Sequence, residues 1–104
     1  MKRIAFKMFL KPGMEREYER RHNEIWPELK QLLSLQGVSD YTIFLDPATN
    51  VLFACQKSES NTGSQKQDDG GIIQKWWDYM ADIMDTNPDN SPISHFLVEI
   101  FHMD

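Results

Sequence analysis

Residues 38–57 read VSDYTIFLDPATNVLFACQK, two short apolar segments on either side of one turn. The first segment, residues 38–45, is rich in β-branched and aromatic side chains, which favour extended backbone. Residues 46–50 supply the Asp, Pro and Asn that are typical of a turn, and residues 51–57 form the second apolar segment. The stretch therefore predicts a β-hairpin, and the elements around it decide the fold.

A strand and a helix are predicted before the hairpin. Residues 3–10 alternate between two sides, as a strand does. Residues 14–35 carry apolar side chains three or four positions apart, which is helical spacing. Pro27 lies inside this pattern and predicts a kink or break near residues 23–26, because proline removes a backbone donor and crowds the preceding turn. Gly37 is well placed to end the helix.

The chain changes character after the hairpin. Residues 57–71 contain no apolar residue, and we interpret them as a mobile polar surface loop. Residues 72–84 have the clearest helical stripe in the sequence. The prolines of residues 86–92 exclude a helix or a central strand there. Residues 94–103 alternate again and predict a final strand.

The resulting order, β-α-β-β-α-β, predicts an α+β, ferredoxin-like fold made of a single domain, residues 1–104. Its four-stranded antiparallel sheet would carry both helices on one face. Several strands have apolar residues on both sides, so the second face would expose an apolar surface to water. We therefore expect a homodimer that packs sheet against sheet.

Charge and composition exclude several classes of function. The net charge of −5 argues against nucleic acid and against an anionic membrane surface as partners. The single cysteine, Cys55, allows neither an intramolecular disulfide nor a multi-cysteine metal site. No apolar stretch is long enough to span a membrane, and residues 1–7 lack the features of a signal peptide. A cytoplasmic protein is expected.

His22 is the strongest candidate for chemistry, since the chain has no P-loop, GxGxxG, HExxH or GxSxG motif. It follows Tyr18 by four residues, so the two side chains share a helix face. Histidine is the side chain best suited to acid–base catalysis near neutral pH. An ordinary solvated helix histidine is the competing interpretation.

Trp76 and Trp77 are the second conspicuous feature. Neighbouring helix residues point about 100° apart, so one ring could pack under the sheet while the other lines a cavity. Aromatic faces suit the C–H surface of a pyranose, and an indole N–H can hold a hydroxyl. Tyr41 offers a phenol on the second strand. Two core tryptophans and a half-exposed strand tyrosine are the alternatives.

Residues 18–29, YERRHNEIWPEL, closely resemble the L-rhamnose mutarotase family, and so do residues 87–92, NPDNSP. The resemblance covers nearly the whole chain in the same order and spacing. It is also carried by Tyr41 with Leu45 and Asp46, and by Trp76 and Trp77 with Tyr79 and Met80.

The resemblance implies an isomerase that interconverts the α and β anomers of L-rhamnose, with no cofactor and no metal, as a dimer of ferredoxin-like subunits of the dimeric α/β barrel type. It implies His22 as the catalytic proton donor, and Tyr18, Tyr41, Trp76 and Trp77 as residues that bind the sugar. The chain departs from the family between Ser58 and Gly71, where family members carry apolar residues and a tryptophan.

Anomer exchange requires a proton delivered to the ring oxygen and another removed from the anomeric hydroxyl. We expect His22 to protonate the ring oxygen, with a tyrosine or a water as the proton acceptor. Two other functions compete, because fold alone does not decide function: a cofactor-independent or haem-degrading monooxygenase of the same fold, and a non-catalytic sugar-binding module.

Overall fold

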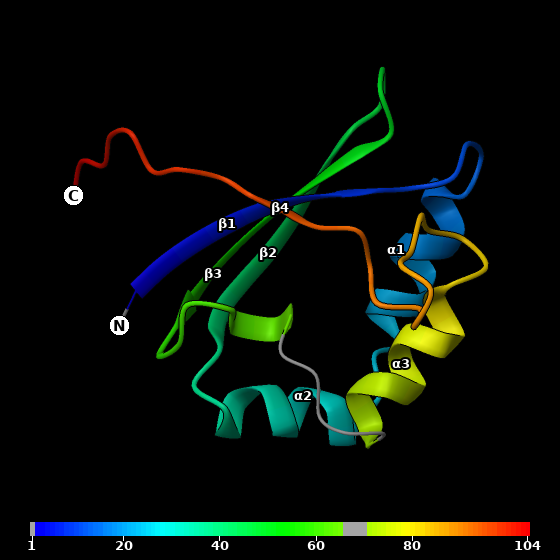
Figure 1. Ribbon diagram of the computed structural model, residues 1–104, viewed down its shortest axis with the longest axis horizontal. Coiled ribbons are helices and arrows are strands. Elements are labelled where there is room, and N and C mark those ends of the chain that lie inside the picture. Colours follow the sequence, from blue (N-terminus) through cyan, green and yellow to red (C-terminus); the bar gives the residue numbers. More distant parts are fainter. Residues whose placement is uncertain (1, 66–70) are drawn as a thin grey trace.

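The predicted hairpin lies at one edge of a four-stranded antiparallel sheet (Figure 1). The computed structural model describes residues 2–65 and 71–104. The hairpin consists of β2 (Ser39–Asp46) and β3 (Val51–Ser58), and β1 (Lys2–Phe9) pairs with the other side of β3. β4 (His95–Phe96) pairs with β1 and completes the order β2-β3-β1-β4. This is the ferredoxin-like arrangement expected from the sequence.

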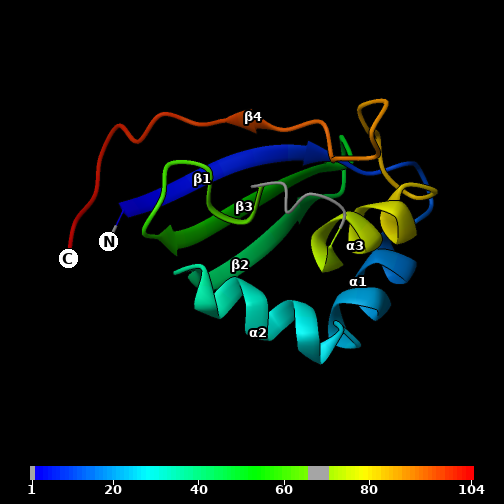
Figure 2. The same cartoon turned by 60° about the horizontal axis from the view of Figure 1, so that its bottom comes forward.

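The helices cover one face of the sheet (Figure 2). The long helical pattern is broken in two, as Pro27 predicts: α1 spans Glu15–Asn23, and α2 spans Pro27–Leu35 with the proline in its first turn. Gly37 ends α2 with a φ of 87°, where the amides of residues 37 and 38 bond to the carbonyls of residues 34 and 33. These paired bonds satisfy carbonyls that the end of the helix would leave open.

The third helix, α3 (Ile72–Met80), is shorter than its apolar stripe suggests. The prediction extended it to Met84. The backbone beyond Met80 instead pairs with the end of β1, since the Lys11 amide bonds to the Ile83 carbonyl and the Asp85 amide to the Phe9 carbonyl. Ile83 and Met84 are buried in the core without being helical. Apolar spacing thus located the buried side chains correctly but not the end of the helix.

The prediction of a final strand over residues 94–103 is also wrong in extent, because β4 contains His95 and Phe96 alone. One further backbone bond joins the Leu97 amide to the Ala5 carbonyl. The chain then runs away from the helices with its apolar side chains exposed (Figure 2). Those side chains are Leu97, Val98, Ile100, Phe101 and Met103.

The polar segment, residues 57–71, is not a surface loop throughout. Ser58 belongs to β3, and the short 3₁₀ helix η1 (Gly63–Gln65) buries both Gly63 and Ser64. Hydrogen bonds make this burial possible for polar groups. Residues 66–70 of the predicted loop lie outside the described part of the chain.

The core lies between the sheet and the helices. β1 contributes Phe6 and Met8, β3 contributes Leu52 and Ala54, and the helices close over them. Within residues 2–65 and 71–104, no helix is long and apolar enough to cross a membrane. The opposite face of the sheet carries exposed apolar side chains, among them Phe44 and Phe53, which stand directly across from each other in the β2–β3 register.

Candidate active site

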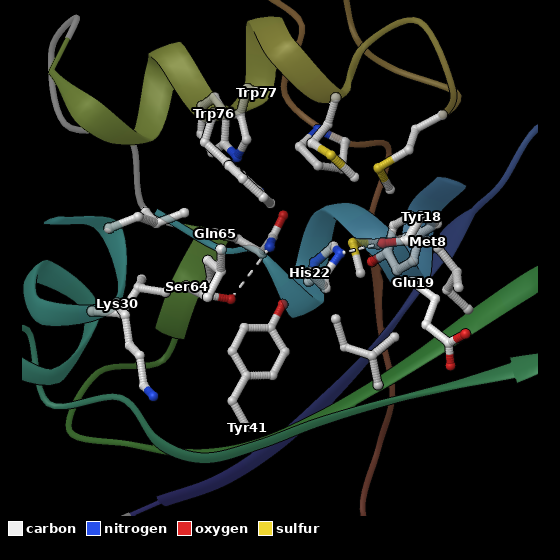
Figure 3. A pocket seen from close by; sticks show the side chains of 18 of the residues that line it. Met8, Tyr18, Glu19, His22, Lys30, Tyr41, Ser64, Gln65, Trp76 and Trp77 are labelled. Carbon is white, nitrogen blue, oxygen red and sulfur yellow. Dashed lines mark hydrogen bonds between the residues drawn. The ribbon is translucent and has the colours of Figure 1, made fainter. Parts of the chain in front are cut away.

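A cavity of about 760 Å³ opens between the inner face of the sheet and the helices (Figure 3). Its walls come from β1, β2, β3, α1, α2, α3 and η1. The cavity is large enough for a monosaccharide, and its lining is mostly apolar with a few polar groups, which is typical of small-molecule sites. All five residues predicted from the sequence line it: Tyr18, His22, Tyr41, Trp76 and Trp77.

His22 is held in one orientation by α1. Its ring stacks on Tyr18 at a centroid distance of 4.2 Å, and its Nδ1 lies 3.1 Å from the Tyr18 backbone oxygen. A carbonyl oxygen can only accept, so Nδ1 carries the proton and donates it to this bond. Burial lowers the pKa of His22 below its ordinary value, although the bond to Tyr18 acts in the other direction. The resting ring is therefore neutral near pH 7, and its Nε2 carries a lone pair.

Trp76 and Trp77 both belong to the buried core and both line the cavity, so each ring combines the packing role and the cavity role considered for the pair. The Trp76 ring meets His22 edge-on at 5.5 Å. Trp26, at the break between α1 and α2, packs edge-on against Trp76 at 5.1 Å. The break between α1 and α2 at Pro27 thus places a third indole, that of Trp26, against Trp76 and holds the Trp76 ring in position.

Tyr41 reaches the cavity from a β-bulge in β2. The register against β3 shifts between Ser39 and Thr42, and Asp40 has a φ of 50°. A bulge of this kind re-aims the side chains beside it. Figure 3 shows the Tyr41 hydroxyl pointing toward Gln65 and His22. Burial raises the pKa of both Tyr18 and Tyr41, so the two phenols stay protonated and are poor proton acceptors.

Arg21 fastens α1 to α3 just behind the catalytic candidate. Its guanidinium binds both oxygens of Asp82, at 2.9 and 3.2 Å, and the Tyr79 carbonyl at 2.8 Å. It also lies 4.4 Å above the centre of the Tyr79 ring, a cation–π arrangement. The hydrogen bond from Arg21 lowers the pKa of Asp82, so this carboxylate remains ionised. The sequence reasoning did not identify this clamp.

Ser64 and Gln65 are cavity residues that the sequence reasoning also missed. They lie in the polar segment, residues 57–71, and nothing in its composition marks one polar residue above another. The NPDNSP loop, in contrast, mainly braces α3: Asn90 donates to Asp78 and Gln74 donates to the Asp89 carbonyl. His95 and His102 are exposed and away from the cavity. Among the described residues, no cluster of His, Cys, Asp and Glu could hold a metal ion.

Fold and site together define a class: small ferredoxin-like proteins that enclose a sugar-sized, aromatic-walled cavity around a partly buried histidine. The family model for L-rhamnose mutarotase matches residues 3–103. The L-rhamnose mutarotases of Bacteroides thetaiotaomicron and Phocaeicola vulgatus are 66% and 64% identical to this chain, and each alignment covers all of both chains. The crystal structure of an L-rhamnose mutarotase from Formosa agariphila superposes with a TM-score of 0.90 at 51% identity over the whole of both chains.

The chain belongs to the L-rhamnose mutarotase family.

Proposed function

We propose that this protein is an isomerase that interconverts the α and β anomers of L-rhamnose in the cavity between the sheet and the helices. The observation that carries the proposal is the partly buried His22, fixed by the Tyr18 carbonyl inside an aromatic-walled pocket. Family membership names the sugar, and the geometry supplies a group that can move a proton.

The neutral His22 ring suggests an order of proton transfers. Nε2 first takes the proton of the anomeric hydroxyl, and the resulting alkoxide expels the ring oxygen from C1. The imidazolium then returns the proton to the ring oxygen, which leaves the open-chain aldehyde and a neutral histidine. Rotation about C1–C2 and reversal of the steps close the ring on the other face. Both oxygens are attached to C1, so one ring nitrogen can serve them in turn.

In this scheme His22 still protonates the ring oxygen, as the sequence suggests, but it must first receive that proton. A tyrosine acceptor is disfavoured because burial raises the pKa of Tyr18 and Tyr41. The two phenols, with the indoles of Trp76 and Trp77, are assigned to sugar binding. Aromatic faces hold the apolar C–H surface of the pyranose, while O–H and N–H groups hold its hydroxyls.

The direct test is saturation-transfer proton NMR on L-rhamnose at anomeric equilibrium, with and without the protein. Magnetisation transfer that requires the wild-type protein supports the proposal. Replacing His22 with Ala should lower the exchange rate by about 10²–10⁴-fold while circular dichroism shows an intact fold. A folded His22→Ala variant with full activity would refute the assignment of His22.

The same experiments separate the alternatives. A sugar-binding module would change its tryptophan fluorescence on adding rhamnose without speeding anomer exchange. A haem-degrading monooxygenase would develop a Soret band with haem, and neither alternative predicts protein-dependent magnetisation transfer.

We further propose that the single domain, residues 1–104, works as a cytoplasmic homodimer. The exposed apolar side chains of residues 97–103 and the exposed Phe44 and Phe53 would be covered by a second copy. The free, exposed Cys55 suits a reducing compartment. Analytical ultracentrifugation at micromolar concentration tests the dimer, which a stable monomer would exclude, and cell fractionation tests the location.

A further inference from the structure

Gln65 reaches the cavity from η1 and has no role assigned by the proposed mechanism. Its side chain is half-buried and lines the cavity. Figure 3 shows its amide beside Trp76, facing the space in front of Tyr41 and His22. It is therefore a polar group within the part of the cavity where the sugar would lie.

The backbone that carries Gln65 is held by buried polar contacts. Gln56, on β3, is 1% exposed. Its Nε2 donates to the Ser64 hydroxyl and its Oε1 accepts from the Ser64 amide, both at 2.8 Å. Gly63 makes this close approach possible, because a Cβ there would overlap Gln56 Oε1 and lie 2.5 Å from Ile4 Cδ1. These two buried hydrogen bonds hold η1 in place against the sheet.

The Gln65 amide is itself oriented. The Ser94 hydroxyl donates to Gln65 Oε1 at 2.9 Å, while Gln65 Nε2 lies 3.4 Å from the Ser64 hydroxyl, a weak contact. An amide nitrogen carries two N–H bonds, and the Ser64 oxygen can take only one of them. The donor edge of the amide thus faces the cavity with its acceptor edge anchored behind it.

We propose that Gln65 donates a hydrogen bond from Nε2 to one ring hydroxyl of the bound sugar and thereby sets which hydroxyl pattern the site accepts. This inference rests on the proposed function. The aromatic walls bind the C–H face of many sugars, whereas a fixed amide discriminates between a sugar that has the matching hydroxyl and one that lacks it. Gln65 is then a specificity residue, contributed by η1.

The test compares Gln65→Leu with wild type, using Gln31→Leu as the matched control. Gln31 is exposed on α2 and does not line the cavity. Anomer exchange is measured by saturation transfer over a range of concentrations of L-rhamnose and of its 2-deoxy, 3-deoxy and 4-deoxy analogues. Gln65→Leu should raise the KM for L-rhamnose by about tenfold, with kcat changed by less than about threefold.

The deoxy sugars identify the contact. For one of them the penalty of Gln65→Leu should vanish, because the hydroxyl that the amide binds is already missing. Ser94→Ala, which keeps the amide but removes its anchor, should raise the KM less than Gln65→Leu does. A KM for L-rhamnose within twofold of wild type, or an equal penalty on all four sugars, overturns the proposal.

Failure of the proposed function gives a different pattern. In that case the wild-type protein itself would not exchange the anomers of L-rhamnose. Tryptophan fluorescence titration with the same sugars then decides on Gln65 alone. A weaker Kd for L-rhamnose in Gln65→Leu than in Gln31→Leu supports the contact, and equal Kd values overturn it.

Discussion

Replacing Arg21 with Ala should destabilise the protein far more than the same change at Arg20, although the two arginines are neighbours on α1 and both bind Glu17. The Arg21 side chain is 9% exposed and that of Arg20 is 51% exposed. Arg20 reaches Glu17 and Glu24 on its own helix, whereas Arg21 also ties α1 to Tyr79 and Asp82. Arg20 also contacts the Tyr79 side chain, but both of these groups are exposed, whereas Arg21 joins the two helices through a buried guanidinium.

The expected loss of unfolding free energy in Arg21→Ala follows from the groups that lose their partner. The Tyr79 carbonyl loses a charged donor at 2.8 Å, and the Tyr79 ring loses its cation. Asp82 is 66% exposed, so its carboxylate is hydrated again once the arginine is gone. The cost therefore falls below the ~3–5 kcal/mol of a fully buried broken pair. A lost charged hydrogen bond and a lost cation–π contact together suggest about 2–3 kcal/mol.

Urea unfolding followed by circular dichroism measures this difference, with wild type, Arg20→Ala and Arg21→Ala compared at one protein concentration. Arg20→Ala should leave the urea midpoint almost unchanged, because exposed ion pairs contribute little. Arg21→Ala should also slow anomer exchange, since α1 carries His22 and α3 carries Trp76. Equal midpoints for the two variants would refute the clamp.

Two further predictions concern protonation and backbone geometry. Anomer exchange should persist to a pH below the ordinary histidine pKa of about 6.5 and be lost as the pH falls further, because burial lowers the pKa of His22 and only the neutral ring can take the first proton. The free energy of unfolding should fall as the pH drops from about 6.5 toward the lower pKa of folded His22, because the unfolded chain binds a proton there more readily than the folded chain does. A wild-type urea midpoint no more sensitive to acid than that of His22→Ala would contradict this. Gly63→Ala should destabilise the protein more than Gly13→Ala, because both glycines have positive φ but only at Gly63 would a Cβ collide with a neighbour, Gln56 Oε1. Equal urea midpoints for the two alanine variants would show that η1 can move aside.

The sequence predicts most of this fold because its strong signals are local. Alternation identifies β1, and β-branched and aromatic residues on either side of a turn identify the hairpin. Pro27 and Gly37 act through their own backbone restrictions. The errors occur where distant segments decide. α3 stops at Met80 because the next residues pair with β1, and β4 stops after Phe96 because the following residues leave the sheet. Side-chain spacing carries no information about either event.

The site residues also divide into those that a local sequence signal identifies and those that distant segments place. Tyr18 and His22 could be paired from their spacing, and the tryptophans stood out by type. Gln65 could not be found this way, because its position depends on contacts with other parts of the chain. Gln56 and Ser94 lie on other segments, and the glycine at residue 63 has no side chain that would point to a site. Arg21 was hidden for a similar reason, since its partners Tyr79 and Asp82 lie far along the sequence, on α3 and in the turn after it.

The bond from His22 Nδ1 to the Tyr18 carbonyl has a consequence for how this catalyst can vary among relatives. The acceptor is a main-chain atom, so no replacement of the side chain at position 18 removes it while α1 persists. The tautomer of the His22 ring is thus set by the geometry of the helix, and no acidic side chain is needed to hold the proton on Nδ1. Substitutions in the surrounding side chains can change the affinity for the sugar while His22 Nε2, the nitrogen that accepts the proton, stays in place.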